Sequence, residues 1–268
     1  LALTSQLDAW HLQDITPAAI QDVLAAVSTT ARREDVYVAL RTMFVAAKRW
    51  GLTTKNPVDV VDRPKHNPKK PQPFQADETT AILDAAKSSR YYGAFAIGLI
   101  IGLRPGELFG LQWRDYDPAG PTLQIQRQAA ELSGRVEVKP PKTDAGVRSL
   151  LLPSKVVAAL DERRAGAMKE GNAGSDWIFP NRNGDVSHRS NVSHRHWVPL
   201  LKKLGIMQRG LHQMRHTAAT RMLNNGVPIT LVTKILGHEK PSTTLDIYGH
   251  LMIADQRRAV EFWDRQIS

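Results

Sequence analysis

Four side chains that could bind and attack a phosphodiester lie close together in the sequence: His212, Arg215, His238 and Tyr248. A guanidinium group matches the geometry of two phosphate oxygens, an imidazole donates a hydrogen bond or accepts a proton, and a phenol becomes a nucleophile when cations or a base assist it. His212 and Arg215 are three residues apart, which would place both side chains on one face of a helix. These residues predict a site that acts on a single phosphate group.

The surrounding pattern predicts the elements that would position these side chains. Apolar residues recur at helical spacing through residues 211–223, and Asn and Gly residues follow as stop signals. Pro228 suits the first turn of a second helix, whose apolar stripe ends at Gly237. His238 would therefore emerge just past the end of that helix, and a third short helix would carry Tyr248.

The same stretch resembles a known family. The series HxxRH at residues 212–216, LGH at 236–238 and a tyrosine ten residues later is similar to the C-terminal signature of the tyrosine recombinases, also called phage-type integrases. Further upstream, GLRPGEL at residues 102–108 resembles the first conserved box of that family, in which the arginine, here Arg104, binds the scissile phosphate. The residues alone leave a second possibility, a purely structural ion pair between Arg104 and Glu107.

A lysine in a predicted β-hairpin is the next candidate. PKT ahead of VRSLLLP resembles the hairpin of the recombinases, and the matching residue is Lys142. The resemblance implies that this lysine protonates the leaving oxygen. Lys139 competes with it, because Pro140 and Pro141 leave the local geometry open, and a lysine on an exposed hairpin commonly faces solvent.

Together these residues predict a reaction at phosphorus that needs no cofactor. Arg104 and Arg215 would clamp the nonbridging oxygens, with His212 and His238 as further hydrogen-bond donors. The resemblance implies that Tyr248 forms a 3′-phosphotyrosine and releases a 5′-hydroxyl, which another strand can reverse without ATP. No acidic cluster suited to two magnesium ions accompanies these residues, so no metal is expected.

Three functions remain open on the sequence. The favoured one is a site-specific recombinase or integrase that acts on double-stranded DNA at specific recombination sites and integrates or excises a phage or mobile element. A type IB topoisomerase-like enzyme would nick and reseal DNA with the same chemistry. A DNA-binding regulator with an idle active site is the third, but the complete set of reactive residues argues against idleness.

Composition sets the outer bounds. The 268 residues carry a formal net charge of +10, with a pI near 9.9, which favours a polyanionic partner. The absence of cysteine excludes thiol chemistry, disulfides and cysteine-bound zinc. No apolar run approaches the length of a membrane span and the start lacks a signal-peptide pattern, so we expect a protein of the prokaryotic cytoplasm that associates with DNA and not with membranes. The first residue is Leu, from which we expect that an N-terminal part is missing.

The chain divides into three predicted parts with an overall mainly α fold and a small antiparallel β-sheet (α+β). Residues 1–62, with two helices, resemble the back half of the helical core-binding domain that contacts DNA in recombinases. Residues 63–73 form a basic, proline-rich linker, which we expect to lie along the phosphate backbone through Lys65, Lys69 and Lys70. Residues 74–268 form the catalytic domain, including a C-terminal tail helix.

The spacing of apolar residues and the positions of glycine and proline predict the remaining elements of the catalytic domain. A nearly all-apolar helix is predicted at 91–103, and LQIQRQA, RVEVK and VRSLLLP predict one three-stranded antiparallel sheet. Further helices are predicted at 154–169 and 189–204, and the second carries the candidate DNA contacts His194, Arg195 and Lys202. The resemblance implies that the tail helix docks into a neighbouring protomer to give a tetramer on two duplexes. Directionality or bending factors are candidate accessory partners.

Overall fold

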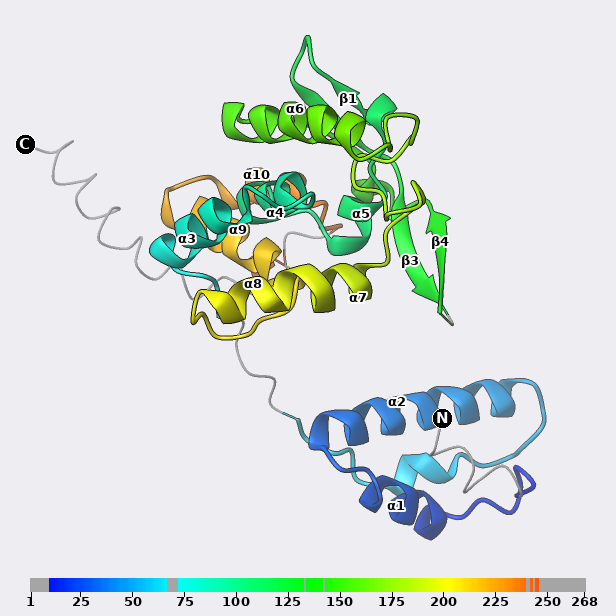
Figure 1. Cartoon of the computed structure of the whole chain (residues 1–268). Coiled ribbons are helices and arrows are strands. Elements are labelled where there is room, and N and C mark those ends of the chain that lie inside the picture. The colour runs from blue at the N-terminus through cyan, green and yellow to red at the C-terminus, as the bar shows by residue number, and fades with distance from the viewer. Residues whose placement is uncertain are drawn as a thin grey trace, which may run out of the picture. The chain divides into compact units, whose positions relative to one another are not determined.

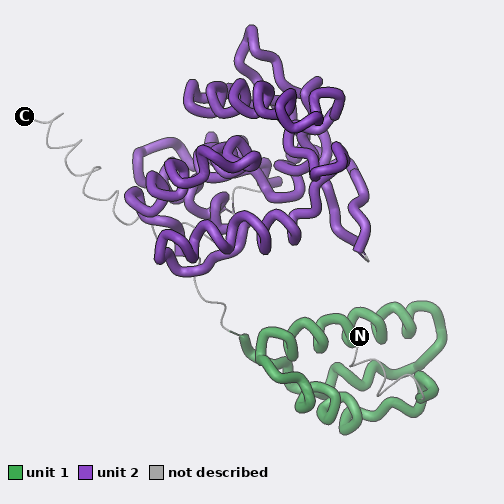
Figure 2. The backbone as a smooth tube through the Cα atoms, viewed as in Figure 1, with its two compact units in different colours: residues 1–70 green, residues 71–268 purple. Residues whose placement is uncertain are grey.

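The chain forms two compact units, residues 1–70 and 71–268 (Figure 2). The computed structural model describes residues 10–66, 72–132, 134–141, 143–239, 242, 244 and 245. Within these ranges none of the helices is both long enough and apolar enough to cross a bilayer.

The first unit is built on the two predicted helices. Thr16 caps α1 (Pro17–Ala25) by accepting a hydrogen bond from the Ala19 amide at 3.2 Å, and α2 runs over Thr30–Arg49. A short 3₁₀ helix, η1 (Pro57–Val60), follows. The fully buried side chains of this small core are Ile20, Phe44 and Val58.

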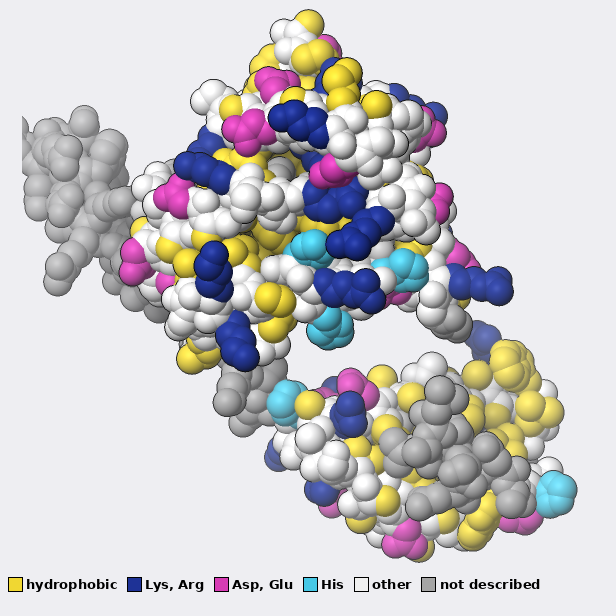
Figure 3. Space-filling view, in the orientation of Figure 1, with side chains coloured by type: hydrophobic (Ala, Val, Ile, Leu, Met, Phe, Trp, Pro, Cys, Tyr) yellow, Lys and Arg dark blue, Asp and Glu magenta, His cyan; other side chains and the backbone are white. Residues whose placement is uncertain are grey.

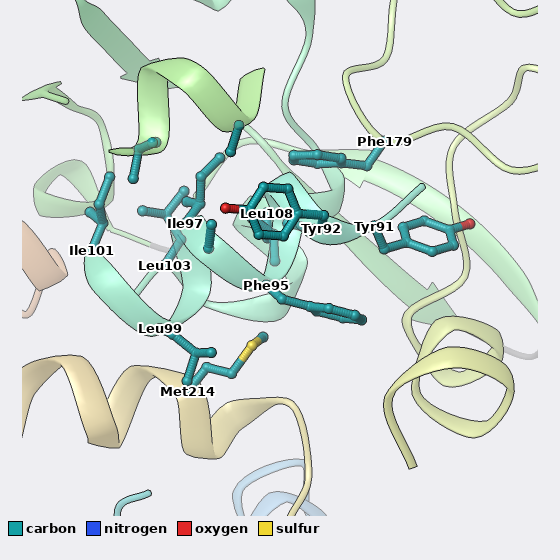
Figure 4. Packing of buried hydrophobic residues seen from close by; sticks show 14 of the residues in the cluster. Tyr91, Tyr92, Phe95, Ile97, Leu99, Ile101, Leu103, Leu108, Phe179 and Met214 are labelled. Carbon is teal, nitrogen blue, oxygen red and sulfur yellow. The ribbon is translucent and has the colours of Figure 1, made fainter. Parts of the chain in front are cut away.

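The second unit is packed around α4 (Tyr92–Ile100), which lies between α6 (Ser154–Lys169) and α9 (His212–Asn224) (Figure 1). All residues from Tyr92 to Leu99 are buried, so α4 contacts protein on every side. Met214 reaches from α9 to lie beside Leu99 (Figure 4). A side chain at Gly98 would meet it, since an added Cβ would lie 2.7 Å from Met214 Cε. The helix that carries the predicted phosphate ligands is thus locked against the centre of the core.

The end of α4 differs from the prediction, which extended the helix to Leu103. The helix ends at Ile100 because Gly102 turns the chain with φ of +87°, and its N–H donates to the Ile97 carbonyl at 3.1 Å. An added Cβ at Gly102 would lie 2.9 Å from Leu236 Cδ2. This close approach brings the start of α5 (Pro105–Phe109) next to α9 and α10 (Ile229–Leu236).

The strands are present but the predicted three-stranded pairing is wrong. One sheet has the order β1-β2-β5 (Tyr116–Asp117, Thr122–Ile125, Arg148–Leu151), and β3 and β4 (Gln128–Leu132, Arg135–Lys139) pair separately. Arg127 lies in the break between β2 and β3, where its side chain forms an ion pair with Asp115 and its carbonyl lies against the backbone of Gly110. An added Cβ at Gly110 would lie 3.1 Å from the Arg127 carbonyl oxygen.

The other helices complete the unit. The predicted helix at 189–204 consists of α7 (Arg189–Val192), a π-helical turn η4 (Ser193–Trp197) and α8 (Val198–Lys203). The remaining elements are α3 (Ala76–Ala86), η2 (Trp113–Asp115) and η3 (Asp144–Gly146). The tail helix and most of the predicted third helix lie outside the described residues. The mainly α fold with small antiparallel sheets is confirmed.

Candidate active site

A cavity of about 530 Å³ collects three of the predicted site residues, Arg104, His212 and His238. These come from the start of α5, the start of α9 and the residue after the α10 C-cap. Its other polar or loop-forming wall residues are Glu107, Gln128, Glu131, Pro141, Thr143, Arg189 and Glu239. Six stretches that are separate in the sequence therefore line one cavity.

Arg104 is held at the edge of this cavity by two elements. Its backbone N–H donates to Glu107 Oε2 at 3.0 Å and its Nη1 to Glu107 Oε1 at 2.8 Å. Its Nη2 donates to the carbonyl of Gly237 at 3.1 Å, which ties it to the end of α10. The ion pair with Glu107 is therefore present, yet the Arg104 side chain remains 37% exposed and lines the cavity. Both interpretations of Arg104 from the sequence are compatible with this geometry.

Arg215 is not a lining residue but lies close to the same group. It is 2% exposed, and its Nη1 donates to the Gly102 carbonyl at 3.0 Å, two residues before Arg104. Its positive charge lowers the pKa of both His212 and His238. Arg215 therefore sits within electrostatic range of the cavity, next to the backbone that delivers Arg104.

The two histidines are electrically neutral in this environment. Partial burial, followed by the charges of Arg215 and Arg104, lowers the pKa of His212, although the residue keeps enough accessible surface to count as exposed. The same causes lower the pKa of half-buried His238 to about 4. Near neutral pH each ring therefore has one N–H donor and one bare nitrogen.

Two threonines form a hydrogen-bonded chain that ends on Nδ1 of His238. Thr233 Oγ1 donates to Thr244 Oγ1 at 3.0 Å, and Thr244 Oγ1 lies 2.8 Å from His238 Nδ1. The Thr244 hydroxyl donates to Nδ1 in the tautomer that carries its proton on Nε2, and accepts from Nδ1 in the other. Both threonines are buried. Sequence reasoning missed this chain, since nothing in the spacing of the threonines signals it.

Of the two candidate lysines and the predicted nucleophile, only Lys139 lies among the described residues. Lys139 is half exposed on β4, pairs with Glu137 and does not line the cavity, although Gln128, which lies opposite it on β3, does. Lys142 lies outside the described residues, but Pro141 and Thr143 on either side of it line the cavity. Tyr248 also lies outside the described residues.

The candidate DNA contacts are mostly at the surface. His194, Arg195 and Lys202 are exposed on η4 and α8, Lys65 is exposed in the first unit, and Lys69 and Lys70 lie outside the described residues. Lys, Arg and His side chains gather on one face of the second unit (Figure 3). Arg195 also lines a smaller cavity of about 240 Å³. Sequence reasoning missed Arg189, which lines the main cavity.

Comparison with known proteins assigns the chain to a family. A sequence profile of the phage integrase family matches residues 72–254, more than half of the chain. A tyrosine recombinase XerC-like protein of Caldanaerobacter subterraneus is 30% identical over 206 residues, and the match covers 70% of this chain but 52% of that protein, so the chain spans about half of its length.

The fold is similar to that of two DNA-bound integrases. The Tn1549 transposon integrase in complex with a circular intermediate DNA has a TM-score of 0.77 and 21% identity, with 98% of this chain and 91% of that chain covered. A lambda integrase tetramer bound to a Holliday junction has a TM-score of 0.64 and 21% identity, with 90% and 71% covered. On the profile match, this chain belongs to the phage integrase family of tyrosine recombinases.

Proposed function

We propose that this chain is a site-specific DNA recombinase that cleaves and rejoins strands through a covalent 3′-phosphotyrosine. The observation that carries the proposal is the meeting of Arg104, His212 and His238 at one cavity, with Arg215 buried beside them. Two guanidinium groups and two neutral imidazoles suit one phosphodiester, whose negative charge grows on the nonbridging oxygens during attack.

The proposed reaction uses these residues together with Tyr248 and Lys142. The Tyr248 oxygen attacks phosphorus, the bond from phosphorus to the 5′ oxygen breaks, and the departing oxygen takes a proton from Lys142. His212 accepts the phenol proton, for which its lowered pKa leaves a bare nitrogen. We propose that Thr244 donates to Nδ1 of His238, so that His238 donates from Nε2 to a nonbridging oxygen. A 5′-hydroxyl from another strand then reverses the step and needs no external energy source.

DNA is the proposed substrate and a tetramer the proposed assembly. Both similar structures are integrases in complex with DNA, and one of them is a tetramer bound to a Holliday junction. We propose specific recombination sites on double-stranded DNA, with residues 254–267 docking into the next protomer. Within this scheme residues 1–62 contribute a core-binding domain and residues 63–73 a basic linker. The formal charge of +10 supports a polyanionic substrate.

We propose that a further set of basic side chains contacts the phosphate backbone of the DNA. Exposure of His194, Arg195, Lys202 and Lys65 supports this role, because phosphate contacts require side chains that reach the surface. We include Lys69 and Lys70 in this set because they belong to the basic linker at residues 63–73.

The function is tested with a nicked suicide substrate carrying the native attachment region, on which cleavage traps the covalent complex. Adduct should form equally well in EDTA and in magnesium, because the proposed cage contains no metal. A strict magnesium requirement would refute the mechanism. A regulator would bind this DNA without forming an adduct, and a topoisomerase would relax supercoiled plasmid lacking any pair of recombination sites.

Thr244→Val is expected to slow adduct formation about tenfold, the cost of about one hydrogen bond, because Nδ1 of His238 loses its hydrogen-bond partner. The change appears in the single-turnover rate at saturating DNA. Thr79→Val is the matched control: Thr79 is equally buried and donates to the Gln75 carbonyl at 2.8 Å on α3. Equal rates for both variants would exclude the threonine chain from the reaction.

A further inference from the structure

Arg148, the first residue of β5, joins three segments with one guanidinium group. Its Nε donates to the Ile235 carbonyl at 2.8 Å, and its Nη1 donates to the Gly146 carbonyl at 2.9 Å. Its Nη1 and Nη2 also bond the two carboxylate oxygens of Glu107 at 3.2 and 2.9 Å. The side chain is 8% exposed and lines no part of the cavity. It therefore acts on the site only through its partners.

Each partner of Arg148 adjoins a residue of the proposed site. Glu107 holds Arg104, and the Ile235 carbonyl lies in the last turn of α10, just before His238. Gly146 ends the turn η3, which follows the cavity-lining residue Thr143. The same side chain thus contacts the supports of the arginine clamp, of one histidine and of the loop that contains position 142.

Gly237 shows how closely α10 sits on this guanidinium group. An added Cβ at Gly237 would lie 2.6 Å from Arg148 Nη1, and φ of +66° already favours glycine there. The carbonyl of the same glycine accepts from Arg104. Both arginines therefore contact Gly237, the residue just before His238, and so constrain the position of His238.

Charge balance gives Arg148 a second effect on Arg104. Burial alone would raise the pKa of Glu107, but the hydrogen bond and charge of Arg148, with the charge of Arg104, lower it, so the carboxylate stays ionised. The carboxylate is 2% exposed and shares its charge between two guanidinium groups. Without Arg148, Arg104 would be the sole counter-charge and would be drawn toward Glu107 and away from a bound phosphate.

We infer that Arg148 is a positioning residue that sets the mutual geometry of Arg104, His238 and the loop at residues 141–146. The inference rests on the proposed function, because the geometry it sets is that of the phosphate cage. A merely structural role would cost stability, whereas a positioning role lowers the rate of the chemical step in protein that is still folded and bound to DNA.

The test compares Arg148→Met with Arg163→Met in the whole chain. Arg163 is a matched control because its side chain is 3% exposed, forms a two-bond pair with Glu170 at 2.9 and 2.8 Å, and donates to the Ile178 carbonyl at 3.2 Å, away from the cavity-lining residues. Both variants are measured below their melting temperatures, for the dissociation constant of the DNA site and the single-turnover rate of adduct formation at saturating DNA.

We expect Arg148→Met to slow adduct formation about 100-fold, the effect of misplacing reacting groups by about 1 Å, with DNA affinity within about threefold of the wild type. Arg148→Lys, which keeps the charge but not the full set of bonds, should recover about tenfold of this loss. Arg163→Met should cleave at the wild-type rate. If Arg148→Met does not fold, Arg148→Lys serves instead: its rate of adduct formation must fall while its DNA affinity stays near that of the wild type.

Two results would overturn the inference: an unchanged rate in folded Arg148→Met, or an equal slowing in Arg163→Met. If the wild type forms no adduct, the proposed function fails instead. The inference is then decided by NMR titration of His238, which faces Arg215, Arg104, Arg148 and Glu107. Removing the Arg148 charge should raise the His238 pKa, while Arg163→Met leaves it unchanged. An unchanged His238 pKa in Arg148→Met would count against the inference.

Discussion

Tyr248→Phe should abolish the covalent protein–DNA adduct while DNA affinity stays within about twofold, because a single hydroxyl is lost and no charge changes. A nucleophile that forms the covalent bond has no substitute in the proposed cage, so the expected loss of rate is about 10⁴- to 10⁶-fold. An unperturbed phenol, with a pKa of about 10, is mostly protonated at neutral pH. The reaction therefore depends on both the hydroxyl and the surrounding cations.

Denaturing gels of the suicide substrate measure this effect directly, since only a covalent complex survives them. Tyr116→Phe is the control, because Tyr116 is a buried tyrosine of the same unit on β1. Its adduct should form at the wild-type rate. Adduct formation by the Tyr248 variant would assign the nucleophile to another residue and would leave the rest of the cage to be reconsidered.

The helices that position His212, Arg215 and His238 could be predicted from the sequence because helix formation depends on short-range patterns. Helical periodicity and the glycine after Leu236 predict α9 and α10, and Gly237 indeed ends α10 with a left-handed conformation. The three-residue spacing of His212 and Arg215 puts both on one helix near the cavity. The catalytic roles of these residues remain predictions.

The supports of the site could not be predicted because they depend on long-range contacts. Arg148 meets Glu107 across 41 residues and the Ile235 carbonyl across 87, and no periodicity records such a pairing. The strand pattern likewise gave the strands but not their partners. β2 pairs with β5, which lies more than 20 residues further along the chain, and the Arg127–Asp115 ion pair lies where β2 and β3 separate.

A helix buried on all sides gives no periodic signal for its end. In α4 every position is apolar, so the sequence cannot distinguish the last helical turn from the following buried turn. Gly102 decides the end through its positive φ and its contact with Leu236. This turn supports the proposed site, since its carbonyl accepts from Arg215 and it leads directly to Arg104.

Arg215→Lys is expected to slow adduct formation about 100- to 1,000-fold, the usual cost of losing one donor that stabilises a developing charge. The lysine keeps a positive charge near His212 and His238, so the neutral state of both histidines is retained. It cannot span two phosphate oxygens, nor hold the Gly102 carbonyl at the same time, because an ammonium group lacks the planar fork of a guanidinium group. The variant therefore separates geometry from charge.

Single-turnover rates at saturating DNA, together with the melting temperature, measure this prediction. Arg221→Lys is the matched control, since Arg221 lies on the same helix but is exposed. It should cleave at the wild-type rate. Arg215 is 2% exposed, so its loss should affect the rate much more than DNA affinity, to which exposed cations contribute most. A wild-type rate for Arg215→Lys would mean that a point charge at this position suffices, and the paired guanidinium clamp would then be wrong.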